Sequence, residues 1–154
     1  MDLSDLVTPE AIIPALKVNS KKQVIQEMAT KAAAVTGLTE RDIFDTLLQL
    51  ERLGSTGVGH GIAIPHGKLV RIDKIVGLFA RLQKPIDFEA LDDQPVDLIF
   101  VLLAPEGAGA DHLKALARIA RLLRNNATAT KLRASTSSSA IYSILTETTE
   151  SDAA

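Results

Sequence analysis

The sequence contains no cysteine and no tryptophan, and aromatic residues make up only 3% of its 154 residues. Without cysteine the chain can form no disulfide, no thiolate metal site and no thiol nucleophile. This absence fits a reducing compartment, and the acidic start Met1–Asp5 lacks the positive stretch of a secretory signal. We therefore expect a cytoplasmic protein.

The chain has no net positive charge and no long hydrophobic run. It has 17 Lys and Arg against 19 Asp and Glu, so it lacks the basic field that nucleic-acid binders carry. Its longest uninterrupted apolar run, Leu98–Ala104, is far shorter than the roughly 20 residues of a membrane-spanning helix. We therefore expect neither nucleic-acid binding nor membrane insertion.

The size and composition are those of one globular domain. Hydrophobic residues make up 46% of the chain and charged residues 23%, which is the ordinary range of folded proteins. We find no internal repeat and no linker. We expect one domain over residues 1–149, followed by a disordered tail over residues 150–154.

Hydrophobic periodicity and capping residues predict helices that alternate with strands. The first helix has a capping box at Ser20 and Gln23 and stops at Gly37, and the third has Asp111 as its N-cap. The predicted helices cover residues 20–35, 39–54, 111–123, 127–132 and 139–145, and the predicted strands cover residues 75–82 and 96–103. This order predicts an α/β protein, with a mixed parallel and antiparallel sheet flanked by helices on both faces.

The most unusual segment is glycine-rich, Gly54–Gly61, and runs into Ile-Ala-Ile-Pro-His-Gly-Lys. It is not a dinucleotide fingerprint, because its third glycine comes one residue early, nor a Walker A loop, because Gly67 and Lys68 are followed by Leu69. Ser55 lacks the elbow motif of a serine hydrolase. We interpret the glycines as a tight, bulged connection between a helix and a strand.

Three histidines, His60, His66 and His112, are the candidates for chemistry. His66 stands between a proline and a glycine, so its imidazole has a rigid base and an open approach, as a nucleophile or ligand needs. His112 falls in the first turn of a predicted helix, where free N–H groups attract anions and disfavour a protonated ring. Simple packing or solvation is the alternative for each. A zinc site is a further alternative, although the spacing of His60 and His66 fits no usual ligand pair.

The third predicted helix also carries a basic stripe, formed by Lys114, Arg118 and Arg121. Most such stripes are solvated faces. If an anion pocket lies at the start of that helix, the stripe would also steer an acidic partner toward it, through electrostatics that salt weakens.

The segment Gly54–Lys68 resembles the signature of the enzyme IIA domains of the mannitol/fructose and nitrogen-regulatory branch of the bacterial phosphotransferase system. Three further pieces fall in the expected order: Pro85–Phe88, Gln94–Leu98 and His112–Ala117. Together they span nearly the whole chain. The Gly-Ser-Thr-Gly opening and the stand-alone length are most similar to the nitrogen-regulatory member.

The resemblance implies the mannitol-type enzyme IIA fold and a phosphotransferase component with a phosphohistidine intermediate. In that branch phosphoryl groups pass from phosphoenolpyruvate through an enzyme I and a histidine phosphocarrier protein to a histidine that matches His66. The acceptor atom is Nε2, so the other ring nitrogen needs an acceptor such as a backbone carbonyl. The second active-site histidine matches His112. The unphosphorylated form regulates potassium-transport and signalling partners by contact, and no metal or cofactor is implied.

One position departs from the family pattern. An Arg-Glu pair commonly precedes the glycine segment, whereas this chain has Leu50 and Glu51, followed by Arg52. A shift of two residues rotates a helical side chain by about 200°, so Arg52 can replace the missing arginine only from a frayed helix end. His60 stands where some relatives have Asn, and we assign it no chemistry.

The expected reaction is an in-line attack by His66 on the phosphohistidine of the carrier, which requires positioning and charge stabilisation. His112 and helix N–H groups can supply them, with Ser55 and Thr56 as further candidate phosphate donors. Two alternatives stay open. One is a fructose- or mannitol-specific enzyme IIA component, and the other is a regulatory binding module that has lost transfer, which Leu50 motivates.

Overall fold

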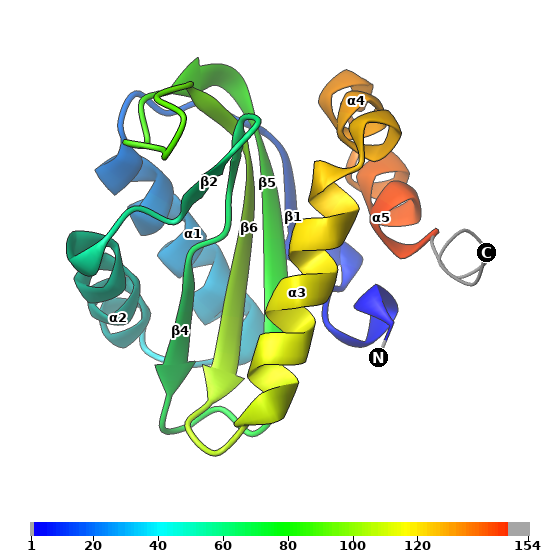
Figure 1. Ribbon diagram of the computed structural model, residues 1–154. Coiled ribbons are helices and arrows are strands. Elements are labelled where there is room, and N and C mark those ends of the chain that lie inside the picture. The colour runs from blue at the N-terminus through cyan, green and yellow to red at the C-terminus, as the bar shows by residue number, and fades with distance from the viewer. Residues whose placement is uncertain (1, 148–154) are drawn as a thin grey trace.

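A six-stranded mixed sheet with helices on both faces forms the centre of the computed structural model, which describes residues 2–147 (Figure 1). The described residues form the helices α1 (Lys21–Thr36), α2 (Glu40–Leu53), α3 (Ala110–Arg124), α4 (Asn126–Ala134) and α5 (Ser138–Thr146). The strands are β1 (Ile12–Leu16), β2 (Gly57–Gly59), β3 (Ile62–Ala63), β4 (His66–Leu69), β5 (Val76–Ile86) and β6 (Val96–Pro105). Two 3₁₀ helices, η1 (Leu3–Asp5) and η2 (Pro9–Ala11), precede β1.

Strand β6 is the central strand and pairs with three others. It runs antiparallel to β5 and parallel to β3 and β4, which pair with successive parts of its other edge. Strand β1 extends the sheet beyond β5, and β2 extends it beyond β3. The side chains of β6 from Leu98 to Ala104 are fully buried, as the continuous apolar run predicts for a strand covered on both faces.

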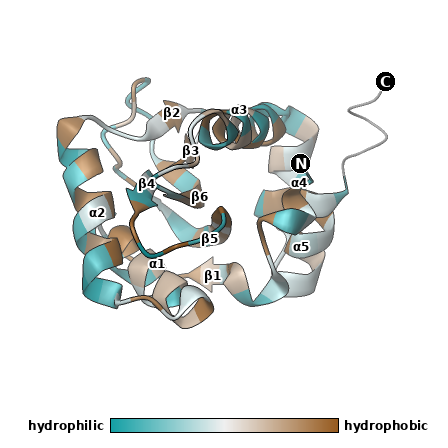
Figure 2. Cartoon of the chain, turned by 90° about the horizontal axis from the view of Figure 1, so that it is seen from below, coloured by the Kyte–Doolittle hydropathy of each residue, from teal (hydrophilic) through white to brown (hydrophobic). Residues whose placement is uncertain are grey.

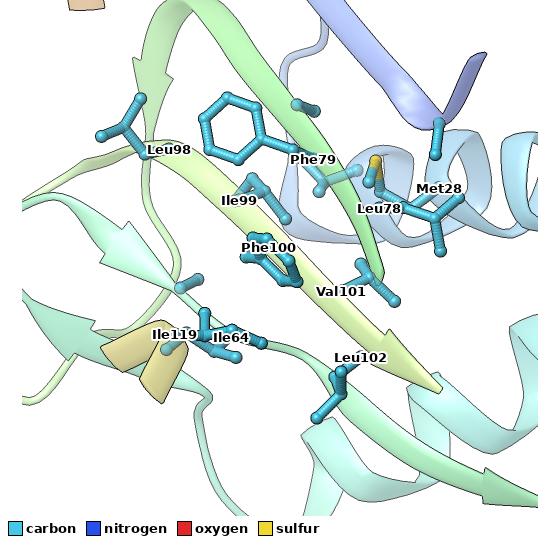
Figure 3. Close-up of a cluster of buried hydrophobic side chains, with 14 of the residues drawn as sticks. Met28, Ile64, Leu78, Phe79, Leu98, Ile99, Phe100, Val101, Leu102 and Ile119 are labelled. Atoms are coloured by element: carbon cyan, nitrogen blue, oxygen red, sulfur yellow. The ribbon is translucent and has the colours of Figure 1, made fainter. Parts of the chain in front are cut away.

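The helices cover the two faces in two groups. Viewed along the sheet, α1 and α2 lie on one side and α3, α4 and α5 on the other (Figure 2). Side chains alternate along β6 between these faces: Figure 3 shows Val101 and its partner Leu78 on the side of Met28 in α1, and Phe100 on the side of Ile119 in α3. The mixed sheet with helices on both faces is therefore confirmed.

Local capping explains why α1 begins and ends where predicted. The Ser20 hydroxyl accepts from the Gln23 N–H at 3.2 Å, and Gly37 closes the helix with a φ of 77°, which a residue without Cβ adopts easily. The Gln23 side chain reaches the Asn19 N–H instead of that of Ser20. Helix α3 differs from expectation, because its N-cap is Gly109 and Asp111 lies in its first turn.

The sequence pattern predicts neither β1 nor the strands that the glycine-rich segment forms in the structure. The segment folds into a β2–β3 hairpin with irregular register between Gly57 and Gly59, and His60 occupies its turn with a φ of 59°. The expected bulged connection is therefore a pair of short strands. The predicted tail over residues 150–154, and the predicted domain end at residue 149, lie outside the described residues.

Candidate functional site

His66 begins β4 directly after a break in the pairing along β6. The carbonyl of Pro65 accepts from the Leu102 N–H at 3.0 Å, and His66 itself lies opposite Leu102 in the parallel ladder. The backbone on both sides of the Pro65–His66 peptide bond is thus held by the central strand β6. The imidazole is half-buried, so it has a fixed base and an accessible side.

A single hydrogen bond orients the His66 ring. Its Nδ1 lies 2.9 Å from the carbonyl oxygen of Ile64. A carbonyl can only accept, so Nδ1 carries the hydrogen, and Nε2 of the uncharged ring keeps a free lone pair. The ring is therefore in the tautomer in which Nε2 can act as a nucleophile.

His112 meets this ring from the first turn of α3. The ring centroids of His66 and His112 are 5.7 Å apart and the planes are tilted by 51°. His112 is 6% exposed, and its Nδ1 has no hydrogen-bond partner among the described residues. The structure therefore brings together the two histidines that come from distant parts of the sequence.

Burial lowers the pKa of His112, and the charges of His66 and Lys68 lower it further. The uncharged form expected from the sequence is therefore favoured, with burial as the largest cause instead of the helix terminus. An uncharged ring can still donate one N–H to an anion placed between the two histidines.

We expect this shift to make stability depend on pH. The unfolded His112 titrates near about 6.5, so between that value and the lower folded pKa the unfolded state binds more protons. The contribution of uncharged His112 to the free energy of unfolding is complete above about pH 6.5. It is lost as the pH falls toward the pKa of His112 in the folded state. Urea unfolding between about pH 7 and pH 5 should show a shallower loss of stability for His112→Asn than for the unmutated protein. The exposed His60 provides the control His60→Asn, which should keep the original slope; equal slopes for His112→Asn would contradict the prediction.

Lys68 is a site residue that the sequence analysis missed. It lies two residues after His66 on β4, and alternate residues of a strand share a face. Its charge acts on the His112 ring. The i, i+2 spacing from His66 was the available signal, but it has meaning only if residues 66–69 form a strand.

A buried carboxylate fixes the glycine-rich segment to the end of α2. Glu51 is 6% exposed and accepts from the Thr56 N–H at 2.9 Å and the Thr56 hydroxyl at 2.6 Å. Lys21 donates to Glu51 at 2.9 Å and also pairs with the exposed Glu89 at 3.1 Å. Burial of Lys21 opposes its charge, but hydrogen bonds to Glu51 and Glu89 and their charges outweigh burial and raise the pKa of Lys21.

The Glu51 contacts continue through the backbone to His66. The Thr56 carbonyl, held next to Glu51, accepts from the Ile64 N–H at 3.0 Å, and the Ile64 carbonyl then accepts from His66 Nδ1. These hydrogen bonds, through Thr56 and Ile64, link the buried Glu51 carboxylate to the His66 ring. Glu51 was not among the candidates from the sequence, because a carboxylate in a predicted helix gives no sign of burial.

The hydroxyl groups of Ser55 and Thr56 are engaged elsewhere. Ser55 donates to the Phe88 carbonyl at 2.7 Å and accepts from the Gly57 N–H at 3.1 Å, while Thr56 donates to Glu51. Each hydroxyl has a single hydrogen. In this conformation neither one can also donate to a phosphoryl group, so their observed role is to shape the segment.

Arg52 lies in the last turn of α2, which stays helical to Leu53. The side chain is exposed and makes no hydrogen bond or ion pair with residues 2–147. It lines a depression shared with Lys21, Ser55 and Glu89. No frayed end is present, so the route by which Arg52 could take the place of the arginine missing at Leu50 is not seen.

His60 is remote from this chemistry. Its N–H donates to Asp92 at 3.0 Å, and its carbonyl accepts from Arg133 at 2.7 Å. Arg133 in turn pairs with Asp97, so His60 fastens the hairpin to α4. Within the described residues no group of three or more His, Asp or Glu side chains could hold a metal ion, and the zinc alternative has no ligand set there. No helix in residues 2–147 combines the length and hydrophobicity of a membrane crossing.

Comparisons with known proteins show which proteins this chain is similar to. A nitrogen regulatory protein from Bradyrhizobium diazoefficiens is 69% identical over 145 residues, which cover 94% of this chain and 95% of that protein. The crystal structure of nitrogen regulatory protein IIA-Ntr from Neisseria meningitidis has a TM-score of 0.89 at 34% identity and covers 94% of this chain and 99% of that one. Mannitol IIA from Escherichia coli, at 22% identity, shows the same fold with a TM-score of 0.75 over 90% of this chain and 97% of that one.

The family match spans nearly the whole described chain. The family model described as phosphoenolpyruvate-dependent sugar phosphotransferase system, EIIA 2, matches residues 5–148. That range includes the glycine-rich segment, both site histidines and every strand of the sheet. The chain therefore belongs to the EIIA 2 family, whose members are phosphoryl-transfer components of that system.

Proposed function

We propose that this chain is the phosphoryl-carrier and regulatory protein of a nitrogen-regulatory phosphotransferase system, with Nε2 of His66 as the acceptor. The donor is a histidine phosphocarrier protein, which family membership implies. The observation that supports the acceptor most directly is the bond from His66 Nδ1 to the Ile64 carbonyl, which leaves Nε2 free. The nitrogen regulatory relatives support the branch.

In the proposed transfer the Nε2 lone pair of His66 attacks the phosphorus in line with the leaving nitrogen of the carrier. The Nε2–P bond forms as the carrier's N–P bond breaks, and the released electron pair returns to the carrier imidazole. The His66 ring becomes positively charged while Nδ1 keeps its hydrogen. The Ile64 carbonyl, 2.9 Å from Nδ1, stabilises that charge.

Negative charge on the phosphoryl oxygens needs donors fixed in advance. His112 can donate one N–H from its position 5.7 Å, centroid to centroid, from His66. The free N–H groups in the first turn of α3 and the Lys68 ammonium add positive potential on the same side. None of these groups has to move a proton during transfer.

A reconstituted relay tests the assignment. The chain is incubated with phosphoenolpyruvate, an enzyme I and a histidine phosphocarrier, and the product is digested at neutral pH for mass spectrometry. We expect one acid-labile phosphate per chain, on His66. Label on any other residue would refute the assignment of the acceptor.

The Arg52→Ala variant should be only partly defective in this relay. Because Arg52 is exposed and without a partner in the described residues, its charge can help to attract the carrier but is screened by solvent. Exposed charge pairs are worth about 0.2–1 kcal/mol, so we expect a rate about 1.4- to fivefold lower. The matched control is Arg41→Ala, another exposed arginine of α2. A rate for Arg52→Ala equal to that of the control would show that Arg52 contributes nothing.

A regulatory module that has lost transfer remains the second candidate, because Leu50 replaces the expected arginine and Arg52 makes no contact in its place. A normal transfer rate in the reconstituted relay would eliminate it. The sugar-specific alternative predicts that phosphate moves onward to a sugar-transport IIB domain. The proposed regulatory function predicts instead that a potassium-transport or sensor protein binds the unphosphorylated form more tightly than the phosphorylated form.

A further inference from the structure

A cavity of about 350 Å³ lies where α3, α4, α5 and η1 meet. Figure 1 shows α4, α5 and the N-terminal turn gathered beside α3. None of His66, Lys68 and His112 lines this cavity, so it is separate from the proposed acceptor site. Its walls combine apolar side chains, including Leu122 and Ile144, with a set of basic ones.

Two basic side chains of the cavity, Arg121 and Lys131, are unpaired or weakly paired within residues 2–147. Arg118, Arg121 and Lys131 line it, against one acid, Glu147. Arg118 is engaged by other groups, among them Asp2 at 3.9 Å. Lys131 reaches Glu147 only at 4.0 Å, with both side chains more than half exposed. Ion pairs this long and exposed are weak. Arg121 has no hydrogen bond or ion pair with the described residues.

The start of α4 adds backbone donors to the same wall. Asn125, Ala127 and Thr128 line the cavity. The Asn125 side chain caps α4 by accepting from the Thr128 N–H at 3.1 Å, but the N–H groups of Asn126 and Ala127 have no acceptor within the helix. They reinforce a positive potential that Arg121 and Lys131 already create.

We propose that this cavity binds a small phosphate-bearing anion of the size of a diphosphate ester. A guanidinium group binds phosphate oxygens through paired hydrogen bonds, so Arg121 can bind them from α3 while Lys131 approaches from α4. The volume is near the lower limit, about 300 Å³, of small-molecule pockets. The apolar side chains of Leu122 and Ile144 would contact the organic part of such a ligand.

The test is an NMR titration of the ¹⁵N-labelled full chain with inorganic pyrophosphate at constant ionic strength. We expect saturable shifts of the backbone amides of Arg121, Asn126 and Ala127. The double variant Arg121→Gln/Lys131→Gln should bind at least about tenfold more weakly, because it loses charge-assisted hydrogen bonds. The matched control, Lys22→Gln/Arg41→Gln, removes the same charge from exposed positions of α1 and α2 and should bind normally.

Adenosine diphosphate in a parallel titration identifies the kind of ligand. Tighter binding than pyrophosphate supports a nucleotide whose organic part uses the apolar wall, and equal binding supports recognition of the diphosphate alone. Equal weakening in both double variants would overturn the proposal, because it would show attraction by net charge only. Shifts confined to the amides around His66 and His112 would also overturn it. The relay assay is independent of either result.

Discussion

The His66→Ala protein should receive no phosphoryl group from the phosphorylated carrier in the reconstituted relay. The substitution removes Nε2, the only atom in the proposed mechanism that forms a bond to phosphorus, so no weaker version of the same reaction remains. The side chain is half-buried at the start of a strand whose backbone is held by β6, so the fold should persist. Radiolabel transfer from phosphoenolpyruvate measures the effect, and circular dichroism checks the fold.

Two other histidine variants complete this experiment. His60→Ala should transfer at the normal rate, because His60 is exposed in the hairpin turn and its hydrogen bonds to Asp92 and Arg133 are made by its backbone. His112→Ala should be slower by about 10- to 150-fold, since a hydrogen bond to a charged group is worth about 1.5–3 kcal/mol. Residual labelling of the folded His66→Ala protein at the normal rate would place the acceptor elsewhere.

Replacing Glu51 with Ala should give the largest loss of stability in the site, about 3 kcal/mol. The change removes the acceptor of the Thr56 N–H, the Thr56 hydroxyl and the Lys21 ammonium at once. Thr56 is buried, so its two donors would lose their acceptor away from bulk solvent. Urea unfolding at neutral pH measures the loss.

Glu51→Gln separates the charge of Glu51 from its shape. The single amide oxygen can still accept from the Thr56 N–H and, less strongly, from Lys21, but the NH2 group cannot accept from the Thr56 hydroxyl. We therefore expect about half of the effect of Glu51→Ala. The control is Glu89→Ala, which removes a carboxylate that is 77% exposed and should change the free energy of unfolding by less than about 0.5 kcal/mol. A change this small for Glu51→Ala would show that the buried network does not stabilise the fold.

Because Glu51 is linked to His66 through Thr56 and Ile64, Glu51→Gln should also slow phosphoryl transfer at a temperature where it is fully folded. A spectroscopic signature distinguishes this effect from instability. The ¹⁵N shifts of the His66 ring should move toward a mixture of tautomers, since the Ile64 carbonyl would be held less firmly.

Helix ends were predictable because their signals are local. Ser20 and Gly37 act within one turn of α1, and Gly54 ends α2. The start of α3 was predicted incorrectly at Asp111, because Gly109, with a φ of 55°, supplies the cap and a glycine has no side chain to reveal that role.

The short strands were not predictable in the same way. Strands β3 and β4 contain too few residues for a period of two to be visible, and they exist because the edge of β6 pairs with Ile62 and, after the break at Pro65, with His66. Strand β1 contains Pro14, which weakens its local signal further. Such pairing is non-local, so no window of the sequence contains it.

The sequence by itself determined the class of fold, the buried central strand, the limits of α1 and the two histidines that deserve attention, because periodicity, capping and residue chemistry are properties of neighbouring residues. Only the tertiary structure decided that His66 and His112 lie close together, that the Ile64 carbonyl engages Nδ1 of His66, and that the hydroxyl groups of Ser55 and Thr56 are occupied. These facts depend on contacts between residues brought together by the sheet, and the free energy of such contacts arises only when distant segments share one core.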